Sequence, residues 1–324
     1  MIGTSAGGRN ALIELVSQFK TEMNAAFFIV MHLSKKGIDN FLVQQLQPFT
    51  PLACSIAKEG ASIEAGHIYI APSNGHLLIK KDQILIGHGP EESRWRPSID
   101  VLFRSAAAAY STRVIGIILT GLLNDGTSGM LAIKRSGGIC IVQDPDEAEY
   151  PGMPLNVLNH MEADHCINLA SMGGVLSGLL LRELAETAAP PDVRAEAQIA
   201  EKTVVGYENV SFLGEKSIYA CPDCGGGLWK IADDGFTRYR CHIGHSYVEK
   251  DLLFKQGENL ESTLWLGLRM MEERSHLLNK IGNDHQKKGL SRIGSGYLES
   301  AKELQRHVDT LKEVLISAQK IAVE

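Results

Sequence analysis

Short apolar runs alternate with amphipathic stretches through the first 180 residues, and this alternation limits the possible folds more than any other feature. Runs typical of buried strands occupy residues 26–31, 68–71, 114–119 and 139–142. Apolar residues recur at helical spacing between them, at residues 10–20, 97–110 and 128–136. Continuous apolar strands separated by amphipathic helices are typical of a parallel sheet covered by helices on both faces. The sequence therefore predicts an α/β fold with a doubly wound, mostly parallel sheet in three layers.

The rest of the chain divides into smaller parts. Residues 77–86 hold two short apolar runs around a Lys-Lys-Asp turn, which predicts a small antiparallel hairpin at the sheet edge. An Ala- and Pro-containing stretch around residues 188–192 interrupts the apolar pattern. We therefore expect an α/β domain over residues 1–185, a linker over 186–205, a Cys/His module over 206–250 and a helical hairpin over 251–324.

The overall composition excludes several classes of protein. The formal net charge of −6 argues against a dedicated nucleic-acid-binding protein, which usually carries a basic surface. No apolar run approaches the roughly 20 residues that a membrane-spanning helix needs. The chain also starts without a basic and apolar export signal. We therefore expect a cytoplasmic protein that neither inserts into a membrane nor binds nucleic acid.

A serine flanked by glycines stands near the start, in the sequence Gly-Thr-Ser-Ala-Gly at positions 3–7. Small neighbours allow a serine to sit on a tight strand-to-helix turn with its hydroxyl exposed, as a nucleophile does. The same glycines suit a phosphate-binding loop or a plain turn. However, the chain has neither G-x-G-x-x-G nor G-x-x-x-x-G-K-[ST], the two common phosphate-binding patterns. A nucleotide-binding protein is therefore disfavoured, and Ser5 stands as a candidate nucleophile.

A serine nucleophile needs a base and an acid that orients this base, and two strand ends supply them. His32 directly follows the apolar run at 26–31, and Asp125 follows the run at 114–119. Ligand sites of open parallel sheets gather at the carboxyl ends of the strands, where all three residues fall. Taken singly, a histidine at a strand end such as His32 is more often a surface or hydrogen-bonded structural residue, and Asp125 is equally a turn or helix-capping residue. Their joint occurrence with Ser5 predicts a Ser-His-Asp triad.

Several motifs follow one another along the first 180 or so residues. They are Ile-Gly-Thr-Ser-Ala-Gly-Gly at 2–8, Met-His-Leu at 31–33, Gly-His-Ile-Tyr-Ile-Ala-Pro at 66–72, Gly-His at 75–76, Arg-Pro-Ser-Ile-Asp-Val-Leu-Phe at 96–103, Ile-Leu-Thr-Gly-Leu-Leu-Asn-Asp-Gly at 118–126, Gln-Asp at 143–144 and Gly-Met-Pro at 152–154. In this order they resemble the catalytic domain of the chemotaxis protein-glutamate methylesterases of the CheB type. The family's serine, histidine and aspartate fall on Ser5, His32 and Asp125. The resemblance also implies a doubly wound parallel sheet that ends in a small hairpin.

The resemblance implies a hydrolase that demethylates γ-glutamyl methyl esters on the cytoplasmic helices of methylated chemoreceptors. His32 would take the proton of Ser5, which attacks the ester carbonyl and forms an acyl-enzyme, while Asp125 orients the imidazole. Catalysis of this kind needs no cofactor, and deamidation of glutamine is left open as a second activity. The main alternative is a non-catalytic regulatory or scaffold protein that uses the esterase fold and the Cys/His module for binding.

Four further residues are predicted around the triad. The backbone N–H groups of Ala6 and Leu122 are expected to hold the oxyanion. Arg96 and Met153 lie in matching motifs and either shape the substrate groove or are structural. The chain departs from the family at Leu122-Leu123, where Met-Gly is frequent, and at residues 31–34, where Gln-His-Met-Pro is frequent. These differences concern the substrate surface rather than the triad.

The start of the chain differs from the best-known members of this family. They carry a phosphorylatable receiver domain ahead of the esterase, whereas four residues precede Ser5 here. We therefore expect that aspartyl phosphorylation within this chain does not control it. At most two residues of a first strand are expected, and losing a central strand would cost much of the core. We attribute this to a clipped N-terminus.

Three cysteines and two histidines cluster between residues 221 and 245. Cys221 and Cys224 belong to a Cys-Pro-Asp-Cys-Gly-Gly knuckle, and Cys241 is followed by two histidines. Three thiolates and one imidazole complete a tetrahedral zinc site, with His245 as the preferred fourth ligand and His242 as its competitor. So small a segment has little core of its own, so we expect structural Zn²⁺ in a zinc ribbon-like module. A metal-free dithiol is the alternative.

Two apolar stripes near the C-terminus predict an antiparallel helical hairpin. One comprises Leu260, Leu264, Leu268 and Met271, and the other comprises Leu304, Val308, Leu311, Leu315, Ala318 and Ala322. The Gly-, Asn- and Ser-containing residues 282–296 are expected to connect the two helices. The stripes serve either as the core of the hairpin or as a surface for self-association.

Overall fold

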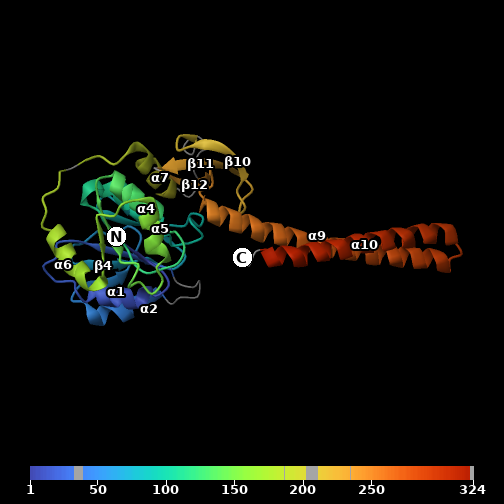
Figure 1. Cartoon of the computed structure of the whole chain (residues 1–324), viewed down its shortest axis with the longest axis horizontal. Coiled ribbons are helices and arrows are strands. Elements are labelled where there is room, and N and C mark those ends of the chain that lie inside the picture. The colour runs from blue at the N-terminus through green and yellow to red at the C-terminus, as the bar shows by residue number, and fades with distance from the viewer. Residues whose placement is uncertain (33–38, 186, 202–210, 234, 322–324) are drawn as a thin grey trace. The chain divides into compact units, whose positions relative to one another are not determined.

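The computed structural model describes residues 1–32, 39–185, 187–201, 211–233 and 235–321, and it forms two compact units, Met1–Asp251 and Leu252–Glu324 (Figure 1). A seven-stranded parallel sheet lies at the centre of the first unit. The strands follow one another in the order β3 (Ala53–Ile56), β4 (His67–Ile70), β2 (Phe27–Met31), β1 (Ile2–Thr4), β7 (Ile115–Ile118), β8 (Ile139–Gln143) and β9 (His165–Ile167).

Alternate residues of the sheet strands pack into two different cores. Phe27 and Ile29 of β2 belong to one core, and Phe28 and Val30 belong to the other. One face is covered by α1 (Gly8–Val16), α2 (Asp39–Leu46) and α6 (Leu169–Leu179), and the other by α3 (Ile99–Tyr110), α4 (Thr127–Arg135) and α5 (Gly152–His160) (Figure 1). Because both faces are buried, these strands read as unbroken apolar runs. The predicted three-layer, doubly wound fold is confirmed.

Strand β1 lies in the middle of the sheet although it is only three residues long. Ile2 is fully buried and pairs in parallel register with Ile29 of β2 and with Ile117 of β7. The strand is therefore one residue longer than the two residues expected, and it supplies the central position from which Ser5 emerges.

The hairpin predicted within residues 77–86 is present as β5 (His76–Lys80) and β6 (Gln83–Gly87). It forms a separate two-stranded sheet that packs on α3 rather than adding strands to the central sheet. Short 3-10 helices at η1 (Gln47–Phe49) and η2 (Ser111–Arg113) complete the connections of the domain.

The interval 186–205, expected to be a linker, contains helix α7 (Pro191–Glu201), and residues 202–205 lie outside the described part of the chain. The helix packs against α3 through a face that includes Val193, Glu196 and Ile199, all of them buried. The expectation of a linker was wrong because one member of this face is a charged residue. Its partner, Arg238, is 42 residues away, so the apolar period that would reveal the helix is broken.

The Cys/His module is a four-stranded antiparallel sheet within the first compact unit. Its strands are β10 (Glu215–Ala220), β11 (Gly227–Asp233), β12 (Phe236–Cys241) and β13 (Ser246–Val248). Buried ion pairs join it to the α/β domain. Arg238 donates to both carboxylate oxygens of Glu196 at 2.7 and 2.6 Å, and Arg240 donates to both oxygens of Glu92 at 2.9 and 2.7 Å.

The C-terminal region forms the predicted helical hairpin from α9 (Glu249–Lys287) and α10 (Ser291–Ile321), of which residues from Leu252 onward make up the second unit. Its core joins Leu268 to Val308 and Leu315, with Leu264, Met271 and Leu311 packed around them. Leu260 is 61% exposed and lies outside this core. Ala322 lies outside the described residues, and the side chain of Ala318 is not described. Self-association through these helices stays a prediction.

The expected connection over residues 282–296 is much shorter than predicted, because the two helices leave only residues 288–290 between them. Gly282 and Gly294 lie inside the helices. A Cβ added to Gly282 would stand 3.0 Å from the carbonyl oxygen of Gly294, so here glycine allows two helix backbones to approach closely instead of marking a loop.

None of the helices in the described ranges combines the length and the apolar composition needed to cross a membrane.

Candidate active site

Ser5 stands on the turn between β1 and α1. Its N–H donates to the carbonyl of Thr120 at 3.1 Å, and its carbonyl accepts from the N–H of Gly8 at 3.0 Å. Gly7 caps α1 with a φ of 73°, a conformation that favours glycine, and a Cβ there would lie 2.9 Å from a carboxylate oxygen of Glu149. The glycines of the motif therefore allow the turn that places Ser5 just ahead of a helix N-terminus.

His32 directly follows β2, the strand that pairs with β1 just ahead of Ser5. Thr4 pairs with Met31 in the β1–β2 register, and the N–H of His32 donates to the carbonyl of Thr4 at 3.1 Å. The buried imidazole places Nε2 2.7 Å from Oδ2 of Asp125. Its Nδ1 has no hydrogen-bond partner among the described residues, and Ser5 is not bonded to it there. Bonds between nucleophile and base are often loose without substrate. Nδ1 is therefore the atom available to receive the Ser5 proton.

Asp125 is held by a set of donors that fixes its orientation. Besides the His32 ring, the Ser98 hydroxyl donates to it at 2.8 Å, the N–H of Ile99 at 2.7 Å and the N–H of Asp100 at 3.0 Å. The two backbone donors are among the first N–H groups of α3, so the positive end of this helix faces the carboxylate. The sequence predicted Asp125, but it did not show these contacts.

Asp100 caps the start of α4 in the same way that Asp125 caps the start of α3. Its Oδ1 accepts from the N–H groups of Gly126 at 3.0 Å and Gly129 at 2.7 Å, and its Oδ2 accepts from the Ser93 hydroxyl at 3.2 Å. Burial, together with the nearby charge of Asp125, raises the pKa of Asp100 to about 7. Two helix N-termini are thus each capped by an acidic residue of the other segment. Asp100 was not predicted, although it belongs to the Arg-Pro-Ser-Ile-Asp motif.

This raised pKa predicts a pH-dependent stability. A carboxyl group that ionises near pH 4 when unfolded and near pH 7 when folded stabilises the fold fully below pH 4, and this contribution is lost as the pH rises through 7. In wild type the free energy of unfolding should therefore fall by roughly 2–4 kcal/mol as the pH rises, and we expect Asp100→Asn to remove this fall. Urea unfolding of both proteins between pH 4 and 8 measures the difference, with the exposed Asp146→Asn as control. An equal pH dependence in wild type and Asp100→Asn would contradict the prediction.

Trp95 covers the candidate base and carried no signal in the sequence. Its indole stacks on the His32 ring with centroids 4.0 Å apart and planes inclined by 5°. The buried Nε1 of this indole has no hydrogen-bond partner in the described part of the chain. Only the fold reveals this contact, because Trp95 reaches His32 from a loop between β6 and α3.

The two residues predicted to hold an oxyanion are Ala6, which is adjacent to Ser5, and Leu122, which follows Gly121, itself close to Ser5. The carbonyl of Ala6 accepts from the Thr120 hydroxyl at 3.1 Å. Leu122 is 51% exposed in the loop after β7. Within the described residues, the backbone N–H groups of Ala6 and Leu122 donate to no acceptor, so both are available to a ligand. Their assignment to the oxyanion stays a prediction.

Met153 lies against the site, whereas the hydrogen bonds of Arg96 join it to neighbouring loops. Met153 is buried, and its N–H donates to the carbonyl of Gly121 at 2.9 Å. A Cβ on Gly121 would lie 2.2 Å from the Met153 sulfur and 2.9 Å from Cβ of Ser5, so Met153 and Ser5 both pack against Gly121. The Arg96 guanidinium donates to Oδ1 of Asn74 and to the carbonyl of Gly89 at 2.7 Å, which joins three loops.

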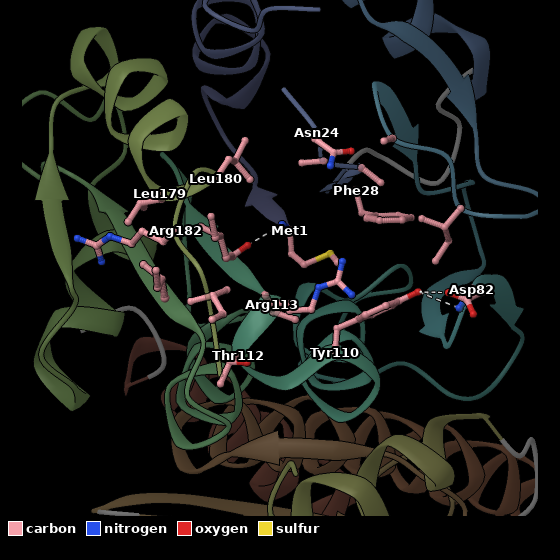
Figure 2. Close-up of a pocket in the computed structure, with 18 residues that line it drawn as sticks. Met1, Asn24, Phe28, Asp82, Tyr110, Thr112, Arg113, Leu179, Leu180 and Arg182 are labelled. Carbon is pink, nitrogen blue, oxygen red and sulfur yellow. Dashed lines mark hydrogen bonds between the residues drawn. The ribbon is translucent and has the colours of Figure 1, made fainter. Parts of the chain in front are cut away.

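A cavity of about 630 Å³ lies at the other end of the sheet (Figure 2). Its lining includes Met1, Phe28, Tyr110 and Arg113 (Figure 2). These residues lie at or near the amino ends of the strands, whereas Ser5 follows the carboxyl end of β1. Because ligand sites of open parallel sheets gather at the carboxyl ends, we place the active site at the triad and not in this cavity.

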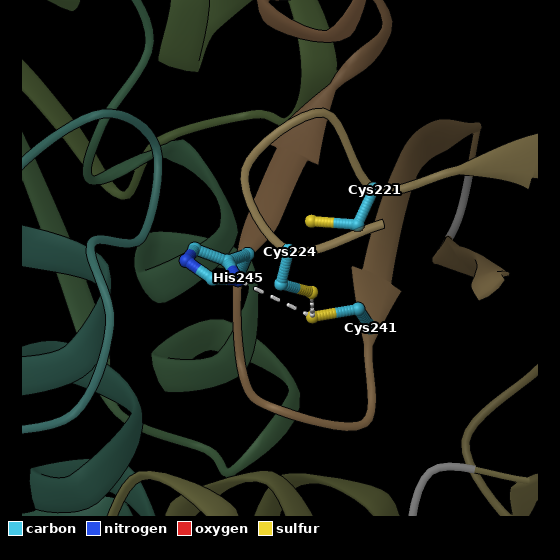
Figure 3. A group of neighbouring side chains, drawn as sticks. All are labelled: Cys221, Cys224, Cys241 and His245. Atoms are coloured by element: carbon cyan, nitrogen blue, oxygen red, sulfur yellow. Dashed lines mark hydrogen bonds between the residues drawn. The ribbon is translucent and has the colours of Figure 1, made fainter. Parts of the chain in front are cut away.

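The predicted metal ligands lie together in the Cys/His module, as Figure 3 shows. The sulfur atoms of Cys221, Cys224 and Cys241 and a ring nitrogen of His245 all lie within 4.8 Å of one another. The Cys241 sulfur is 3.7 Å from that of Cys224 and 3.5 Å from Nδ1 of His245. The competitor, His242, lies instead against Gly226. Three thiols and an imidazole at this separation suit a tetrahedral Zn²⁺ ion.

The predicted ligands lie on two turns, one over residues 221–226 and the other over residues 241–245. In the first, Cys221 donates its N–H to Gly226 at 2.7 Å, and its carbonyl accepts from Gly225 at 2.8 Å. In the second, the N–H of Cys241 donates to the carbonyl of His245 at 3.0 Å. The phenol of Tyr247 lies 3.2 Å from the Cys221 sulfur and donates to Asp223 at 2.6 Å, so the ligands are supported by a second layer of contacts.

Comparisons with known proteins identify relatives of the first domain. A family model described as CheB methylesterase matches residues 1–176. A putative protein-glutamate methylesterase/protein-glutamine glutaminase of Leptospira interrogans is 36% identical over 170 residues, which cover 52% of this chain and 88% of the relative. The protein-glutamate methylesterase/protein-glutamine glutaminase 2 of Methanosarcina mazei is 36% identical over 179 residues, which cover 53% of this chain and 48% of the relative.

A solved structure matches the fold as well. The catalytic domain of a Thermotoga maritima CheB methylesterase superposes with a TM-score of 0.53 and 27% identity, over 55% of this chain and 96% of that domain. The match covers the first domain, whereas this chain spans about half the length of the Methanosarcina relative.

Proposed function

This chain belongs to the CheB methylesterase family of hydrolases, and we propose that it demethylates glutamate methyl esters on chemoreceptors. The resemblance stated from the sequence is thereby confirmed for the family. The observation that carries the proposal is the bonded pair of His32 and Asp125 beside Ser5, at the carboxyl ends of the adjacent strands β2, β1 and β7. The names of the relatives support the substrate.

The proposed reaction uses each of these three residues. The Ser5 oxygen attacks the ester carbonyl carbon while its proton passes to Nδ1 of His32. The tetrahedral intermediate then expels the methoxy group, which takes this proton and leaves as methanol. Water repeats the sequence on the acyl-enzyme, which releases the glutamate carboxylate and restores Ser5. Throughout, Asp125 orients the imidazole and stabilises its cation.

The same groups support a second reaction, the deamidation of glutamine. An acyl-enzyme forms from a carboxamide in the same way, with ammonia instead of methanol as the leaving product. Both relatives carry protein-glutamine glutaminase in their names. The two proposed substrates are therefore a glutamate methyl ester and a glutamine at the same side-chain position. The proposed partners are methylated chemoreceptor helices.

The experiment that tests this function follows product release by the whole chain. Methylated chemoreceptor is incubated with the protein, and methanol is measured; unmodified receptor that carries glutamine is assayed for ammonia. Release of neither product would overturn the proposal and favour a non-catalytic scaffold.

We also propose that the Cys/His module holds one structural Zn²⁺ ion at Cys221, Cys224, Cys241 and His245. The ion contributes stability rather than chemistry, because four protein ligands leave no open position. We expect about one equivalent of zinc by elemental analysis, and its loss in Cys241→Ser, since the ion links the two turns. The exposed Cys166→Ser is the control that keeps the metal. A metal content near zero in protein with reduced thiols would contradict this prediction.

A further inference from the structure

The Cys/His module contacts the loop that carries Trp95. The N–H of Ser93 donates to the carbonyl of Ser246 on β13 at 3.0 Å, and Glu92 and Ser246 form an isolated parallel bridge. Glu92 accepts two hydrogen bonds from Arg240 of β12, and all of these residues except Trp95 are buried. The contact is therefore a desolvated one in which a charged pair and a backbone bond hold the loop against the module.

The loop itself is a tight turn that links Glu92 to Trp95. Each of these two residues donates its N–H to the carbonyl of the other, at 3.2 and 2.9 Å. The two residues between them, Ser93 and Arg94, have φ values of 49° and 71°. This is the left-handed region, which is unfavourable for residues other than glycine, so the turn needs support from outside. The module supplies that support at Glu92 and Ser93.

A second contact joins Asp251, which follows the module, to residues near Trp95 and near Asp125. Asp251, in the first turn of α9, is 3% exposed and lies 3.8 Å from the Arg94 guanidinium. Burial raises the pKa of Asp251, and Arg94 and a hydrogen bond with Asn124 counter this rise. Asn124 directly precedes Asp125. Residues that follow the metal ligands thus contact Ser93 and Arg94 of the turn that carries Trp95, and Asn124, which precedes Asp125.

The metal ligands are adjacent in sequence to the contact residues. Arg240 directly precedes Cys241, and Ser246 directly follows His245. An ion bound to these two ligands fixes both ends of the turn from which Arg240 and Ser246 reach the loop. The path from the metal to the base is therefore short: ligand, contact residue, turn 92–95, Trp95, His32.

We propose that Trp95 is a positioning residue for His32, and that the metal-loaded Cys/His module holds Trp95 in place through Glu92 and Ser93. The module therefore contributes to the active site through the turn 92–95, and it is not an independent domain. The inference rests on the proposed function, because the position of His32 matters only when His32 serves Ser5.

The first measurement concerns Trp95 in the full, zinc-loaded chain. Because a misplaced base lowers the rate of the chemical step, Trp95→Ala is expected to lower kcat for methanol release about 10- to 100-fold with little change in KM. Trp95→Phe keeps a stacked ring and is expected to restore most of kcat. The exposed Ile218→Ser on β10 is the matched control and leaves both constants unchanged. Equal kcat for wild type and Trp95→Ala would overturn the proposal.

The second measurement couples the metal to Trp95. Zinc is removed by a chelator from wild type and from Trp95→Ala, and the rate of Ser5 labelling by a fluorophosphonate is followed. We expect about a tenfold loss in wild type and less than about a twofold loss in Trp95→Ala, because the metal acts through this residue. Equal factors in both proteins, or no loss in wild type, would overturn the coupling.

Two provisions keep the outcomes distinct. Circular dichroism reports whether the metal-free chain stays folded; if it does not, zinc-loaded Asp251→Asn and Arg240→Gln replace chelation in the same comparison. Labelling needs no receptor, so it separates two failures. Labelling of Ser5 without methanol release refutes the proposed substrate, whereas methanol release that is insensitive to Trp95 and to the metal refutes this inference alone.

Discussion

Replacing Ser5 with alanine is expected to abolish methanol release from methylated chemoreceptor, with kcat lowered by roughly 10⁴- to 10⁶-fold. The reason is that, in the proposed mechanism, this hydroxyl forms the covalent bond of the acyl-enzyme, so we expect no other group of the site to replace it. His32 and Asp125 stay in place in this variant, because their contacts run through the backbone of Thr4 and through α3 rather than through the Ser5 side chain. The folded structure should therefore persist while the reaction stops.

The control for Ser5 is a serine of the same domain without a role in the site. Ser17 is exposed at the end of α1, and its hydroxyl donates to the carbonyl of Glu14 at 2.7 Å. Ser17→Ala is expected to release methanol at the rate of wild type and to react with a fluorophosphonate, whereas Ser5→Ala does neither. Equal methanol release from Ser5→Ala and wild type would exclude Ser5 as the nucleophile.

The second large effect is expected for Asp125→Asn, which should lower kcat about 10³- to 10⁴-fold with KM nearly unchanged. A neutral amide neither stabilises the imidazolium of His32 nor selects the tautomer that leaves Nδ1 free to accept a proton. The variant also loses stability, because the side-chain amide cannot accept all the bonds donated by Ser98, Ile99 and Asp100. A buried donor left without an acceptor costs roughly 1–3 kcal/mol.

Two measurements separate these consequences for Asp125→Asn. Steady-state methanol release gives kcat and KM, and urea unfolding gives the free energy of unfolding. Asp146→Asn, which changes an exposed carboxylate after β8, should match wild type in both. If Asp125→Asn kept kcat within about tenfold of wild type, the carboxylate would be a helix cap alone, and the triad would lose its third member.

The position of the candidate triad could be predicted from the sequence because it depends on local patterns. Continuous apolar runs mark strands that are buried on both faces, and parallel strands place their carboxyl ends along one edge. His32 and Asp125 each follow such a run, and Ser5 follows the short first strand, so their proximity needs no long-range information beyond the strand order. The Cys-x-x-Cys knuckle is local in the same sense, since its spacing alone suits two ligands of one ion.

Charged residues that are buried in pairs could not be predicted in this way. Glu92 lies between Arg104 of α3 and Arg240 of β12, and these arginines hold its pKa at about 2 although burial alone would raise it. Arg240 is 148 residues further along the chain. A sequence pattern shows such residues as ordinary surface charges, so the attachment of the Cys/His module to the α/β domain became visible only in the fold.

The sequence by itself determined the layered α/β architecture, and it predicted the three candidate residues at the strand ends and the Cys/His cluster, because each follows from periodicity or spacing within a short segment. The tertiary structure alone decided that Trp95 stacks on His32, that Asp100 and Asp125 cap each other's helices, and that helix α7 exists with Glu196 on its buried face. These features depend on contacts between segments that are distant in the chain. These contacts are stabilised by buried charged pairs and by ring stacking between segments, and no single segment contains both partners.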